Sequence, residues 1–169
     1  MALDLNDKTS NANNLTNTNG TEWTTDFPFV DSTEAVELNG TTAYLSAADS
    51  TSLSITGSIT LEGWIKFDTV PGDASHREFL SKYGTSGNLA YSLGIISQAG
   101  VIKLRFIKSS DGTEAEQYLV NWTPTANTWY HIAARYDNST KKIQYYVNGT
   151  AQGAESAALT NAGIFNSTN

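Results

Sequence analysis

The sequence predicts an all-β protein made of antiparallel strands, and three observations support this prediction. Short apolar runs alternate with turn residues over most of the 169 residues. Several runs carry apolar and polar side chains at alternate positions, as strands with one buried face do. No stretch keeps helical periodicity for three turns. A chain of this length can bury a core between two packed layers, so we expect one β-sandwich domain spanning residues 1–169.

The apolar runs have the length of ordinary strands. They cover residues 35–38, 43–46, 59–67, 78–82, 90–96, 102–108, 116–120, 130–136 and 142–147. Turn motifs separate them at Asn39-Gly40, Pro71-Gly72-Asp73, Ser86-Gly87-Asn88, Asp111-Gly112, Asp137-Asn138-Ser139 and Asn148-Gly149. Because Gly, Asn and Asp adopt positive φ at low cost, these motifs indicate hairpins between antiparallel neighbours.

Alternation within three of the runs predicts which side chains face the core. The core-facing positions are Leu61, Gly63, Ile65 and Phe67, then Tyr130, Ile132, Ala134 and Tyr136, and finally Ile143, Tyr145 and Val147. The opposite face then carries Glu62, Trp64, His131, Arg135 and Tyr146. We therefore expect one dry face on each strand and one face with polar and aromatic groups.

Charge and cysteine content exclude several classes of function. The net charge is -7, and the 10 basic residues are scattered, so we expect no binding to nucleic acid. The absence of cysteine excludes disulfides, thiolate metal sites and a cysteine nucleophile. No run approaches the roughly 20 apolar residues of a membrane span, so we expect no membrane insertion. An export signal, if the protein has one, is expected outside this chain.

Several longer motifs occur in a fixed order along the chain. They are VELNGTTAYL at 36–45, SITLEGWIK at 58–66, FLSK at 79–82, YSLG at 91–94, TWYHIAARYD at 128–137 and KIQYYVNG at 142–149, preceded by DKTSNANNL at 7–15. In this order and spacing they resemble the laminin G-like domains of the concanavalin A-like lectin/glucanase superfamily. The resemblance covers essentially the whole chain. It implies a jelly roll of two curved sheets, used for recognition in a larger extracellular or surface-exposed protein, such as an adhesin or a phage-tail protein.

The sequence departs from the family pattern at its C-terminal end. Family members normally continue past a segment like 163–166 into two more strands, the last with a Gly-x-x-Asp motif, whereas this sequence stops at Asn169. The resemblance therefore implies a sandwich that lacks its C-terminal strands, unless another strand fills the vacancy. An unfilled position would expose backbone donors and acceptors, which invites strand addition from another chain.

We do not expect an enzyme. Glucanases of the superfamily place two carboxylates on one strand, and retaining hydrolysis needs them ~5 Å apart. Their Glu-x-Asp-x-x-Glu signature is absent, and the nearest approaches are Glu34 with Glu37 and Glu114 with Glu116, at the edges of loops. In Glu62-Gly63-Trp64 the alternate position is a tryptophan. Neither His76 nor His131 lies in a motif that supplies a nucleophilic serine.

The predicted outward residues suggest a carbohydrate site. Sugars bind by stacking their C–H faces on aromatic rings while polar groups take the hydroxyls. Trp64 and Tyr146 are the candidate platforms, and Glu62, His131 and Arg135 the candidate hydrogen-bonding partners. Two alternatives remain open. In the first, a loop covers Trp64 and the charged groups are an ordinary solvated face. In the second, the domain is a structural or protein-interaction module without a sugar ligand.

The resemblance also implies a possible structural Ca²⁺. Related domains hold calcium between the N-terminal segment, the backbone at the position of Asn39 and Gly40, and the Asp of the final strand. Calcium prefers oxygen ligands, which loop carbonyls, carboxylates and Asn amides provide. The last of these ligands has no counterpart here, so we expect a weakened site.

Overall fold

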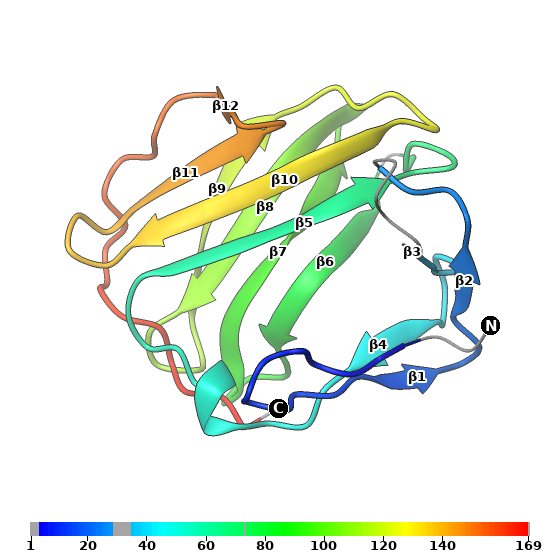
Figure 1. Cartoon of the computed structure of the whole chain (residues 1–169). Coiled ribbons are helices and arrows are strands. Elements are labelled where there is room, and N and C mark those ends of the chain that lie inside the picture. The colour runs from blue at the N-terminus through cyan, green and yellow to red at the C-terminus, as the bar shows by residue number, and fades with distance from the viewer. Residues whose placement is uncertain (1–3, 29–34, 73, 169) are drawn as a thin grey trace. The chain divides into compact units, whose positions relative to one another are not determined.

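The computed structural model describes residues 4–28, 35–72 and 74–168, and over these residues it is built almost entirely of strands (Figure 1). Twelve strands and one 3-10 turn are present in the described part, and no α-helix. The all-β prediction is therefore confirmed. The contacts divide the chain into residues 1–53 and residues 54–169, and each unit is described by itself.

Unit one contains four short strands and the 3-10 turn, Thr51–Leu53. Strand β1 (Thr16–Thr18) pairs antiparallel with β4 (Tyr44–Ser46), and β2 (Glu22–Thr24) pairs antiparallel with β3 (Ala35–Glu37). The sequence predicted β3 and β4 but not β1 and β2. The two missed strands are three residues long and mostly polar, so they lack the alternation that identifies a strand.

Unit two consists of two four-stranded antiparallel sheets, which lie one over the other in Figure 1. The first sheet has the order β12 (Thr150–Gln152), β11 (Lys142–Val147), β10 (Trp129–Asp137), β5 (Ile59–Lys66). The second sheet has the order β6 (His76–Tyr83), β7 (Leu89–Gln98), β8 (Val101–Ser109), β9 (Ala115–Asn121). This confirms the antiparallel β-sandwich. Only β12 was not predicted in this unit.

The inner faces of the two sheets form one apolar core. From the first sheet it receives Ile132, Ala134 and Tyr136 of β10 and Ile143 and Tyr145 of β11, all fully buried. From the second sheet it receives chiefly Leu93, Ile95, Leu104 and Phe106. Phe106 and Tyr136 stack across the core with ring centroids 6.3 Å apart. The predicted core faces of β10 and β11 are correct, and Leu61, Ile65 and Phe67 pack against the same core while staying half-buried.

A buried lysine holds one end of the core together. Lys108 of β8 is fully buried, and its Nζ donates to Glu116 Oε2 at 3.1 Å and to the carbonyl of Asn161 at 2.7 Å. The same carboxylate accepts the backbone N–H groups of Thr160 (2.5 Å) and Asn161 (3.1 Å). This network attaches the segment that follows β12 to the second sheet.

Candidate functional site

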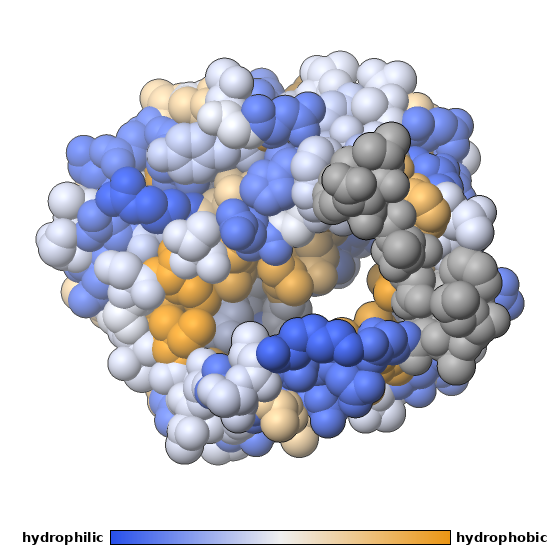
Figure 2. Space-filling view, in the orientation of Figure 1, coloured by the Kyte–Doolittle hydropathy of each residue, from blue (hydrophilic) through white to orange (hydrophobic). Residues whose placement is uncertain are grey.

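The outer face of the first sheet brings the predicted ligand-binding residues together. Glu62 and Trp64 lie on β5, His131 and Arg135 on β10, and Tyr146 on β11. Their register partners show that all five share the face opposite the core, because the intervening residues of each strand pack inward. In Figure 2 this face is largely hydrophilic, with lighter and apolar patches between the charged residues.

The five residues lie around Ala133 on this face. Glu62 lies opposite Ala133 on one side, and Tyr146 lies opposite Ala133 on the other. Ala133 is only 7% exposed, so the larger side chains around it cover its methyl group. Sequence alternation places Ala133 outward, but it does not show that its neighbours bury it.

Trp64 and His131 form the aromatic part of the face. They are direct cross-strand partners, and their ring centroids lie 5.4 Å apart with the planes tilted by 59°. Trp64 is 44% exposed, so part of its ring is accessible to a ligand. The Glu62 carboxylate Oε2 lies 3.8 Å from His131 Nε2, too far for a short hydrogen bond.

The β11–β12 hairpin fixes the backbone at His131. The His131 N–H donates to Asn148 Oδ1 at 2.8 Å, and the Asn148 N–H donates to the His131 carbonyl at 2.8 Å. Asn148 and Gly149 have φ values of 50° and 78°, as a type I′ turn requires. Asn148 thus positions a site residue, and the Asn-Gly motif was the signal in the sequence that located this turn.

Arg135 lies on the same face but is held by its own strand. Its guanidinium Nη2 is 2.7 Å from Asp137 Oδ2, and this hydrogen bond raises the pKa of Arg135. Hydrogen bonds from Ser139 and from Arg135, with others from the turn backbone, lower the pKa of Asp137. Arg135 therefore forms an ion pair with Asp137 on the same face, and its strand neighbours are Thr60 and Gln144.

The predicted metal residues lie in unit one and form a closed turn. Asn39 Oδ1 accepts the backbone N–H groups of Thr41, Thr42 and Ala43 at 2.9 to 3.0 Å, and Gly40 has a φ of 71°. These hydrogen bonds engage the side-chain oxygen of Asn39, whereas the predicted calcium site uses the backbone at Asn39 and Gly40. In the described part of the chain, no group of three or more His, Cys, Asp or Glu side chains has a metal-binding arrangement. A calcium ion at Asn39 and Gly40 stays a prediction.

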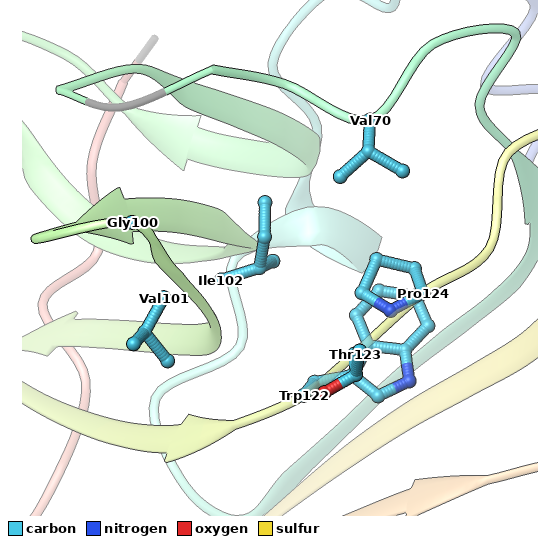
Figure 3. Close-up of a pocket in the computed structure, with 7 residues that line it drawn as sticks. All are labelled: Val70, Gly100, Val101, Ile102, Trp122, Thr123 and Pro124. Atoms are coloured by element: carbon cyan, nitrogen blue, oxygen red, sulfur yellow. The ribbon is translucent and has the colours of Figure 1, made fainter.

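An apolar pocket lies at one end of unit two (Figure 3). It has a volume of about 300 Å³, and Val70, Val101, Ile102, Trp122 and Pro124 supply most of its walls. Trp122 is 6% exposed and makes an edge contact with Tyr130, with centroids 5.1 Å apart. Thr123 contributes the only side-chain hydroxyl of the lining. This pocket lacks the charged and polar groups of the outer face.

The glutamates of the two carboxylate pairs considered from the sequence differ in what surrounds them in the structure. Glu116 is bound to Lys108 and to the backbone of Thr160 and Asn161, and these contacts oppose a catalytic role for it. Glu114 lies in the turn that the Asp111 carboxylate caps. Glu34, the partner considered for Glu37, lies outside the described residues.

The two packed antiparallel sheets and the aromatic outer face define a lectin-like β-sandwich, a class of recognition domains. A family model described as the concanavalin A-like lectin/glucanases superfamily, of laminin G type, matches residues 39–168, which is more than half of the chain. The chain belongs to this superfamily. A search of the curated proteins found no match. No helix in the described residues is long and apolar enough to cross a membrane.

Proposed function

We propose that this domain is a non-catalytic recognition module that binds carbohydrate on the outer face of the first sheet. Trp64 and Tyr146 provide the stacking surfaces, and Glu62, His131 and Arg135 provide hydrogen bonds to hydroxyl groups. The observation that carries the proposal is the exposed Trp64 ring beside His131, on the face that Glu62 and Tyr146 share.

The spacing of polar groups around Trp64 suits a sugar ring. A pyranose that stacks on an indole directs its equatorial hydroxyls outward from the rim of the ring. Glu62 Oε2 and His131 Nε2 are 3.8 Å apart, so both atoms keep capacity to bind one hydroxyl or two adjacent hydroxyls. Tyr146 lies on the other side of Ala133 from Glu62 and offers a second ring for an adjacent sugar residue.

The charges around the site favour neutral sugars. Glu62 is 61% exposed and repels an anionic ligand close to Trp64. The one guanidinium of the site, Arg135, is already paired with Asp137. The whole chain carries a net charge of -7, which adds to the repulsion of anionic glycans. We therefore propose neutral hexose-containing glycans, on an extracellular surface, as the ligand class.

Glycan binding by wild type and Trp64→Ala tests this proposal. We expect wild type to bind a subset of neutral glycans and Trp64→Ala to bind them about tenfold or more weakly, because stacking is lost. Tyr44→Ala removes another exposed aromatic ring, which is 52% exposed in unit one, and is the matched control. Failure of every neutral glycan to bind, or equal binding by Trp64→Ala, would overturn the assignment.

A second candidate function is a protein-interaction module without a sugar ligand. The observation that favours it is the position of β5, an eight-residue strand at the end of the first sheet. Sheet edges bind extended polypeptide through backbone hydrogen bonds. Binding of an extended peptide at β5 without binding of any glycan would favour this second candidate, and glycan binding that Trp64→Ala abolishes would favour the first.

A further inference from the structure

We propose that the outer edge of β5 is a receptor for one β-strand supplied by another polypeptide. The proposal does not depend on carbohydrate binding, because it uses the backbone and the core face of β5; Glu62 is the one residue that belongs to both proposed sites. Three features of unit two support it: the hydrogen bonding of β5, the incomplete cover of the core beside it, and the way in which the other sheet edges are protected.

In the described part of the chain, residues 60–63 of β5 form backbone hydrogen bonds on one side only. All eight residues pair with β10, and no strand of residues 54–72 or 74–168 pairs with the other side. In an antiparallel strand, alternate residues direct their N–H and C=O groups to opposite neighbours. Within the described part of the chain, Thr60, Leu61, Glu62 and Gly63 have no hydrogen bond beyond the β10 ladder. Backbone donors and acceptors of this segment are thus available to a further strand.

The core is incompletely covered next to this edge. Leu61 faces the core but remains half-buried, whereas its register partner Ala134 on β10 is fully buried, and Ile65 is also half-buried. A Cβ placed on Gly63 would meet no atom within 4 Å. Figure 2 shows hydrophobic surface directly below β5, on the side away from β10. An added strand would bury this apolar surface, which favours its binding.

The other three edges of the sandwich carry features that hinder strand addition. Strand β12 is only three residues long, and β6 contains two register shifts. At β9 the Tyr118 carbonyl accepts the Tyr145 hydroxyl at 2.6 Å, and the Asn121 carbonyl accepts Gln152 Nε2 at 2.9 Å. Short length, bulges and occupied backbone groups are the usual means of protecting an edge. Strand β5 is long and pairs without a register shift.

The side chains of β5 define the chemistry of the incoming strand. Apolar residues are required opposite Leu61, Gly63 and Ile65, where the strand faces the core, and a large one fits opposite Gly63 because that position is empty. A basic residue is favoured opposite the exposed Glu62 on the outer face. The partner is therefore an extended segment with alternating apolar and polar residues and a lysine or arginine at the level of Glu62.

Synthetic nine-residue peptides test the proposal. Peptides with apolar alternation are made with lysine or glutamate opposite Glu62, in both strand directions, and binding to the full chain is measured by fluorescence anisotropy. Hydrogen exchange then locates the bound peptide. We expect protection of amides within residues 60–65 and about fivefold tighter binding of the lysine peptide, the size of one favourable cross-strand charge pair.

Two substitutions are the matched controls: one reverses the charge at position 62, and the other adds a large side chain at position 63. Glu62→Lys should invert the preference so that the glutamate peptide binds more tightly. Gly63→Leu should weaken peptides with a large residue opposite position 63 and favour peptides with glycine there. Absence of binding at millimolar peptide, or protection at β6, β9 or β12 without protection at β5, overturns the proposal. Dimerisation that the same two variants abolish would also overturn it, since the occupant would then be a second copy of the chain.

Discussion

Lys108 and Glu116 show how a charged residue is accommodated in this core. Lys108 is fully buried, and an unpaired ammonium group there would cost several kcal/mol, roughly the stability of a small domain. Glu116 and the Asn161 carbonyl satisfy it, while the Tyr136 ring centroid lies 5.3 Å from the Nζ atom. The pair therefore fixes the segment around residue 160 and keeps the end of the sandwich closed.

Removing the charge of Glu116 should destabilise the fold more than its partly exposed position suggests. Glu116→Gln leaves Lys108 without a counter-ion in a buried site, and we expect a loss of about 3 kcal/mol in the free energy of unfolding. Urea denaturation followed by tryptophan fluorescence measures the change. Glu114→Gln, two residues away in the exposed turn, is the control. Equal stability of the two variants would show that the network does not hold this end.

The hydrogen bonds of the Glu116 carboxylate predict how the stability of the fold responds to acid. Burial opposes its ionisation, but the Thr160 N–H, the Lys108 ammonium and the Asn161 N–H outweigh burial and lower the pKa of Glu116 below 4.5. A lowered folded-state pKa stabilises the fold above the unfolded value, and this contribution is lost as pH falls through the folded value. We expect the unfolding free energy to decrease below pH 4.5. A pH series of urea curves should show a shallower decrease in Glu116→Gln.

At the scale of elements, the sequence predicted the strands that lie within a run of apolar residues. The inward faces predicted for β5, β10 and β11 agree with the structure. Strands β1, β2 and β12 were missed because they are three residues long and mostly polar. The Ala99-Gly100 turn was missed for a related reason, since alanine at a φ of 50° carries no turn signal.

Two glycines in strands should respond in opposite ways to substitution. Gly63 has open space where a Cβ would lie, so Gly63→Val should raise the unfolding free energy by about 0.5–1 kcal/mol through β-propensity and apolar cover. A Cβ on Gly94 of β7 would lie 2.9 Å from Glu78 Cα, so Gly94→Ala should cost about 2 kcal/mol. Thermal or urea denaturation compares them. Destabilisation by Gly63→Val would mean that this side of β5 is already covered.

At the scale of the whole molecule, the sandwich was predictable but the shape of the site was not. Alternation alone assigns Glu62, Trp64, His131, Arg135 and Tyr146 to one face. Their proximity depends on the order β12-β11-β10-β5 and on the register that sets Trp64 opposite His131 and Ala133 between Glu62 and Tyr146. The pairing of Arg135 with Asp137 depends on rotamers, which periodicity does not report.

The most direct test of the account is a map of where a neutral oligosaccharide contacts the protein. In a ¹H–¹⁵N titration of the full chain, the account predicts shift changes at the Trp64 indole and at the backbone of His131, Ala133 and Tyr146. Residues of the second sheet that face away from the core, such as Arg105, should be unchanged. Shift changes confined to the pocket beside Trp122, or to the second sheet, would contradict recognition by the outer face of the first sheet.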